Sequence, residues 1–127
     1  MGMEQTVQFA EGNVPRWTAV AALLAHRSFP IQVRMIDGQL AFPDEEPPES
    51  WRELRLAMPH GMVTVRRQPD RVLLVTWGNA ERALVQDWNA LTWAFTEAGA
   101  GEVLGPAGPV SAGDYLRTAD LAPGFRP

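Results

Sequence analysis

The segment from residue 31 to residue 77 most constrains the fold, because it holds short apolar runs separated only by turns. In IQVRMIDGQLAF, apolar and polar residues alternate on either side of Asp37 and Gly38, a dipeptide typical of a tight hairpin. The runs WRELRLAM, MVTVRR and RVLLVTW follow after brief turns. The last run is apolar in both phases, which is typical of a central strand covered on both sides. Connections this short favour antiparallel pairing.

Two helices are predicted to flank these strands. The first lies in GNVPRWTAVAALLAHRS, with Asn13 as N-cap and Pro15 where a missing N–H costs little. The second begins after Asn79 as N-cap and ends in AGAG, where Gly99 is predicted to adopt the left-handed conformation. An earlier segment, EQTVQFAE, alternates weakly and is a candidate first strand.

These elements predict an α+β fold in a single domain, residues 1–127. We expect a four- to five-stranded antiparallel sheet with two helices packed on one face, in the order (β)-α-β-β-β-β-β-α. The Gly- and Pro-rich residues 103–127 are expected to form an irregular tail that packs on the domain or on a neighbouring subunit, with a short helix capped by Ser111. In topology alone, this order is similar to helix-grip and TATA-binding-protein-like folds and to small acidic secretion chaperones.

Composition excludes several kinds of chemistry. The chain has no cysteine and no lysine, so thiolate sites, disulfides and Schiff bases are absent. A net charge of −4 disfavours nucleic-acid binding. The absence of a long apolar run or a basic, apolar amino end predicts a cytoplasmic protein that binds no membrane. The arginine-only basic residues and the abundant Ala, Gly and Pro indicate bacterial, high-GC coding.

No catalytic or metal-binding pattern stands out. The two histidines are predicted to be a solvated residue near a helix end, His26, and a turn residue, His60. The acidic PDEEPPES loop lacks the glycine of a calcium loop, so we expect a solvated loop and neither metal nor cofactor. Asp87 lies at the edge of the apolar helix stripe, where we expect an ion pair, for instance with an arginine, or a raised pKa.

Arginines are the more informative charged residues. Arg34, Arg55 and Arg66 occupy the polar phase of three different predicted strands. If those strands pair in sequence order, the three side chains stand together on one sheet face. Such a face is either solvated, with glutamates interleaved, or a surface for a protein partner or an anionic ligand.

Trp93 lies on the polar side of the second predicted helix, opposite the stripe that contains Trp88. An indole in water would leave on the order of 200 Å² of apolar surface uncovered. The tail is one candidate cover, because it carries apolar residues that include Tyr115 and Phe125. A second copy of the chain, a swapped tail, or a ligand or foreign partner are the alternatives.

Two functional hypotheses follow. The first is a non-catalytic interaction module of adaptor, chaperone or immunity type, which uses the arginine-bearing sheet face and Trp93 to bind a protein partner or a second copy in a homodimer. The second is a domain that binds a small apolar ligand, or a helix-grip-type enzyme, with a pocket between the long helix and the sheet. The residues predicted to line that pocket are Met58, Arg67, Trp77, Asp87 and Trp88.

Overall fold

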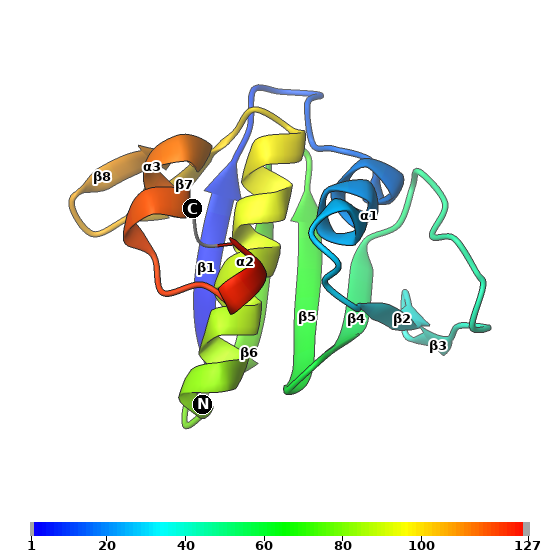
Figure 1. The fold of residues 1–127 in the computed structure, drawn as a ribbon. Helices are drawn as coiled ribbons and strands as arrows, with labels where there is room; N and C mark the ends of the chain where they lie inside the picture. The colour runs from blue at the N-terminus through cyan, green and yellow to red at the C-terminus, as the bar shows by residue number, and fades with distance from the viewer. Residues whose placement is uncertain (1, 126–127) are drawn as a thin grey trace.

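An antiparallel sheet forms the body of the structure, which is a computed structural model that describes residues 2–125 (Figure 1). Within these residues the sheet has eight strands in the spatial order β3-β2-β4-β5-β6-β1-β7-β8. The strands are β1 (Gly2–Gln8), β2 (Gln32–Ile36), β3 (Gln39–Leu40), β4 (Glu53–Met58), β5 (Gly61–Gln68), β6 (Arg71–Trp77), β7 (Glu102–Gly105) and β8 (Gly108–Ser111). The helical segments are α1 (Trp17–His26), α2 (Arg82–Ala98), α3 (Ala112–Thr118) and the 3-10 turn η1 (Pro123–Phe125).

The predicted α+β class is correct, but the sheet is larger than the four or five strands expected. The Asp37–Gly38 hairpin is present as β2 and β3. The candidate first strand, β1, inserts between β6 and β7 and pairs with both. Residues expected to be irregular form the hairpin β7–β8, in which Val103 pairs with Val110. The hairpin pairs with the backbone of β1, and β8 becomes the edge strand of the sheet in its place.

All the helices of the described chain pack on one face of the sheet. Figure 1 shows α1 and α2 side by side in front of it, with α3 beside α2 over β7. Alternate strand residues point towards these helices and are buried, as the pleat requires. The central ones are Leu54, Leu56, Val63, Val65, Val72 and Leu74. One apolar core therefore lies between the helices and this face.

The helix ends differ from the predicted ones. α1 and α2 begin later than expected, with Arg16 and Glu81 as N-caps and no side-chain capping bond at either. Ser111 does cap α3, because its hydroxyl accepts a hydrogen bond from the backbone N–H of Asp114. N-caps are local preferences of about 1 kcal/mol, so tertiary packing overrides them readily.

Gly99, at the end of α2, is needed for close packing and not for its backbone conformation. Ala100 takes the left-handed conformation there (φ 49°), whereas Gly99 was predicted to do so. A Cβ atom on Gly99 would lie 2.4 Å from Cε1 of Phe9. The glycine therefore lets the loop before α1 approach the end of α2.

The tail of the same chain covers Trp93. The ring centroid of Phe125 lies 5.6 Å from that of Trp93, edge to face, and the guanidinium of Arg27 stands 4.6 Å above the indole. Phe125 also meets Phe29 edge to face at 5.2 Å. As a result only 5% of Trp93 is exposed. A helical wheel of α2 alone could not reveal this contact.

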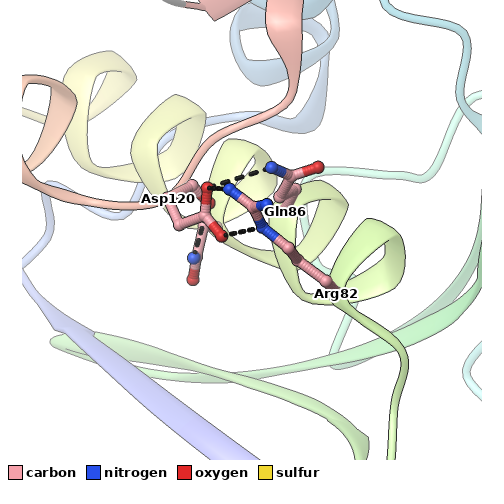
Figure 2. A network of polar contacts seen from close by, with 4 residues as sticks. Arg82, Gln86 and Asp120 are labelled. Atoms are coloured by element: carbon pink, nitrogen blue, oxygen red, sulfur yellow. Dashed lines mark hydrogen bonds and ion pairs between the residues drawn. The ribbon is translucent and has the colours of Figure 1, made fainter.

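Polar contacts hold the tail along α2 (Figure 2). Asp120 accepts two hydrogen bonds from Arg82 (2.9 and 3.2 Å) and one from the amide of Gln86 (2.9 Å). One helical turn on, the side-chain amide of Asn89 donates to the backbone carbonyl of Asp120 (2.9 Å). In α3, the hydroxyl of Tyr115 lies 2.8 Å from Oε1 of Gln5, and its burial raises the pKa of this phenol to about 12. The part of the tail that follows β8 thus belongs to the helical layer.

Candidate interaction surface

The face of the sheet opposite the helices is the candidate site. The helices of residues 2–125 all lie on the other side of the sheet (Figure 1). β6 is apolar in both phases, as noted from the sequence, but only one phase is covered: Val72 and Leu74 are buried against the helices. Its other phase, Leu73, Val75 and Trp77, faces outwards. The prediction that β6 is covered on both sides is therefore wrong, although its central position is correct.

The strand register assembles this outer face in rows. In one row, Arg55 pairs with Met35 on one side and with Thr64 on the other. Thr64 in turn pairs with Val75, and Val75 with Glu4. This row crosses β2, β4, β5, β6 and β1. Because residues in register lie on the same face of a sheet, all five side chains share the outer surface.

Two more rows flank it. On one side Glu53 pairs with Arg66, Arg66 with Leu73, and Leu73 with Thr6. On the other side the pairs are Ala57 with Met62 and Trp77 with Gly2. Met62 stands level with Trp77, two residues along from the pair of Thr64 and Val75. The centre of the face is therefore apolar, and its margins carry charge.

The charges on this face are of two kinds. Glu53 and Arg66 form an exposed ion pair (Oε2 to Nε, 3.2 Å), which contributes at most about 1 kcal/mol. Arg55 and Glu4 make no ion pair with any of the described residues. The side-chain contact of Arg55 is with Sδ of Met35, 4.0 Å from Nη1. Within β4, β5, β6 and β1, Arg55 is thus a cation and Glu4 an anion without an ion pair to the described residues, and Glu102 on the adjacent β7 is a second such anion.

A hollow of about 380 Å³ opens on the same face. Its lining residues include Arg55, Met62, Val75 and Trp77. Gly2, which pairs with Trp77, also lines the hollow. Trp77 is 65% exposed, an unusual state for so large an apolar side chain. The hollow and the indole together give the face a shape that a partner could fit.

Two of the three predicted arginines meet on this face. Arg55 and Arg66 are on neighbouring strands of it, as the polar phase predicted. Arg34 is displaced, because the register between β2 and β4 shifts between Val33 and Met35. This β-bulge puts Met35 opposite Arg55 in place of the predicted arginine. A bulge of one residue has no clear signal in an alternating sequence.

Trp93 does not belong to this face. It lies in the helical layer and is covered by Phe125 and Arg27, so its predicted role in partner binding has no accessible indole to support it. Trp77 is the tryptophan that the arginine face does contain. It was predicted to line a pocket on the other side of the sheet, but the phase of Leu73 and Val75 puts it outside.

The other residues predicted to line a pocket between helix and sheet are not gathered around a cavity. Met58 and Trp88 are buried in the core, and the indole N–H of Trp88 donates to the backbone carbonyl of Leu74 (3.0 Å). Arg67 stacks at 4.8 Å over the ring of Trp51. The buried rings of Trp51 and Phe95, whose centroids are 6.3 Å apart, belong to the same core between helices and sheet.

Asp87 is buried and bound to His60, where an arginine had been suggested as its partner. Oδ2 of Asp87 accepts a hydrogen bond from the backbone N–H of His60 (2.8 Å) and lies 3.0 Å from its ring Nδ1. Oδ1 is buried without a hydrogen-bond partner among the described residues. Burial raises the pKa of this carboxyl, and the bonds from His60 oppose that shift. The contact fastens the turn between β4 and β5 to α2.

The described residues contain no candidate metal site and no candidate membrane-spanning helix. Within residues 2–125, no three His, Asp or Glu side chains gather closely enough to hold a metal ion. None of the helices in the same range combines the length and the apolar character needed to cross a bilayer. Comparison of the chain with protein-family models, curated proteins and solved structures gave no match.

Proposed function

We propose that this chain is a non-catalytic protein-interaction module and that it binds its partner with the outer face of β4, β5, β6 and β1. One observation carries the proposal. The outer phase of the central strand β6 is apolar, with Leu73 and Val75 half-buried and Trp77 exposed, and none of the described helices packs on this side of the strand (Figure 1). A contiguous apolar area on a sheet that is otherwise well packed is typical of an interaction site.

The distribution of residue types supports a protein partner. Specific protein interfaces have an apolar centre, which loses its water on binding, and a polar rim. Here Leu73 and Val75 lie on the central strand, Met62 and Trp77 extend the apolar area along one flanking row, and Arg55 and Glu4 lie on the outer strands β4 and β1. Tryptophan and arginine are the residues that most often contribute strongly to binding. A solvated face would instead carry polar side chains on its central strand.

The alternative of a ligand pocket between α2 and the sheet has less support. Its proposed lining is divided between the core, which contains Met58 and Trp88, and the outer face, which contains Trp77. We therefore favour the surface over the pocket, and binding over catalysis.

Site-specific photo-crosslinking in the cells that produce the protein tests this proposal. A photoreactive phenylalanine derivative replaces Thr64, at the centre of the outer face, or Ala22, an exposed residue of α1 in the helical layer. We expect defined protein adducts from position 64 and none from position 22. The adducts should disappear when Leu73→Arg introduces a charge into the centre. Equal labelling from both positions, or adducts that survive Leu73→Arg, would contradict the assignment of this face.

A further inference from the structure

We propose that the partner of the outer face is a second copy of this chain, in a dimer whose two-fold axis runs parallel to the strands, between β5 and β6. This inference rests on the proposed function, because it names the partner of the same face. Three features support this dimer: the register of the sheet, the opposite charges of Arg55 and Glu4, and the row that contains Trp77.

An axis in that position has a simple geometric effect. It leaves each row at its own level along the strands and exchanges the two sides of the sheet. As a result β5 of one copy faces β6 of the other, and β4 faces β1. Such an interface is self-complementary, as two-fold symmetry requires. It corresponds to the aligned packing of two sheets, in which the strand directions differ by about 30°.

The unpaired charges become complementary in this arrangement. Arg55 and Glu4 occupy the same row, and β5 and β6 lie between their strands. Three strand spacings of about 4.8 Å separate them by about 14 Å, too far for an ion pair within one copy. Across the axis, however, Arg55 of each copy faces Glu4 of the other, so the interface gains two ion pairs. No like charges face each other in the flanking row, where Arg66 meets Leu73 and Glu53 meets Thr6.

The angle between the sheets does not break these pairs. Arg55 lies about 7 Å from the axis, one and a half strand spacings. Rotation of one sheet by about 30° then displaces Glu4 of the second copy by about 4 Å, within the reach of a long arginine side chain. An axis between β6 and β1 would instead set Glu4 against Val75. Arg55 would then face β8 of the other copy and could not pair with Glu4.

The row that contains Trp77 is also self-complementary across this axis. Because Met62 stands level with Trp77, each indole faces Met62 of the other copy, and each Ala57 faces Gly2. Large side chains thus oppose the hollow, and small ones oppose each other at its margin. A thioether against an aromatic ring is a favourable contact. The two exposed indoles would be covered in one step.

The size of the face sets the expected affinity. Four strands of about seven residues span about 20 Å in each direction, or about 400 Å² in projection. This is smaller than the roughly 800 Å² per partner of a standard interface. We therefore expect a dimer that dissociates in the micromolar range.

Sedimentation equilibrium of the purified chain, from micromolar to near-millimolar concentration, tests the inference. The wild type should pass from monomer to dimer over this range. Arg55→Glu and Glu4→Arg should each weaken the dimer by at least about tenfold, because each sets two pairs of like charges against one another. An equimolar mixture of these two variants should recover the dimer, since both contacts in the mixed pair are again between opposite charges. Arg16→Glu, an exposed charge reversal in the helical layer, should leave the association unchanged. Circular dichroism establishes that each variant is folded.

Three results would overturn the inference. One is a wild type that stays monomeric at the highest concentration. The second is a dimer whose dissociation constant neither charge reversal changes. The third is a failure of the two variants to recover the dimer when they are mixed. None of these results contradicts the proposed function, which fails when position 64 labels no protein, labels no more than position 22, or labels independently of Leu73. Crosslinks from position 64 to a different protein, together with a monomeric wild type, would keep the interaction face and exclude the second copy.

Discussion

Phe125→Ala tests whether the tail stabilises the helical layer through its last aromatic residue. Phe125 is fully buried and meets Phe29 and Trp93 edge to face, at 5.2 and 5.6 Å. Truncation of a buried phenylalanine costs about 3–5 kcal/mol, and its aromatic contacts contribute part of that. Because Phe125 lies in a short 3-10 turn that can relax, we expect the lower value, about 3 kcal/mol. With about 2.1 cal/mol/K of unfolding entropy per residue over 127 residues, this lowers the Tm by about 11 °C.

Urea unfolding followed by tryptophan fluorescence, together with calorimetry, measures the effect. The native emission of Phe125→Ala should also shift to the red, because Trp93 loses its cover. Phe42→Ala is the matched control: Phe42 is 78% exposed, so its truncation should change the free energy of unfolding by less than about 0.5 kcal/mol. If the two variants lost the same stability, the docking of the tail on α2 would be refuted.

Three further predictions concern the core and its buried polar groups. Gly99→Ala places a methyl group against the ring of Phe9 and should lower the free energy of unfolding, measured by thermal unfolding, by about 1–3 kcal/mol. Gly113→Ala is the control, because a methyl group there meets only ordinary contact distances in α3 and should not destabilise the fold. Equal effects of the two substitutions would argue against the close approach of Phe9 to Gly99. The raised pKa of Asp87 means that the folded chain holds this proton more tightly than the unfolded chain, so a penalty develops as the pH rises from 3.8 through the folded pKa. Asp87→Asn cannot ionise, so its unfolding free energy should rise relative to that of the wild type between acid and neutral pH, and a constant difference would contradict the shift. Tyr115, the single tyrosine, should ionise near pH 12 in an absorbance titration, with stability falling between about pH 10 and 12; a midpoint near 10 would show a solvated phenol.

Local patterns predicted the local structure well. The hairpin at Asp37 and Gly38, the two long helices and the cap at Ser111 depend on residues close together in sequence, and all are present. Pairings between distant segments were missed. Val7 pairs with Val103, but valine is common at any strand position, so the sequence does not indicate which strand either residue pairs with.

The candidate site was predictable in part for the same reason. Alternation put Arg55 and Arg66 on one face, because a strand repeats every two residues. The bulge at Arg34 interrupts that repeat, so the position of its side chain could not be read from alternation. Trp77 follows the phase of Leu73 and Val75, but which phase meets the helices depends on the whole sheet. An apolar pattern therefore shows that a surface needs cover without showing what covers it.

The position of β1 has a consequence for how the chain acquires its structure. β1 comes first in the sequence, yet its neighbours in the sheet, β6 and β7, come only after residue 70 and residue 101. On the ribosome, β1 therefore cannot pair until β6 and β7 have been made, whereas the strands from β2 to β6 have partners within residues 32–77. Pairing between strands so far apart in sequence is slow, because the entropy cost of closing a large loop comes before any stabilising contact forms. We therefore expect maturation in two stages, with β1 and the tail closing last, and the far edge of β6 exposed to aggregation until they do.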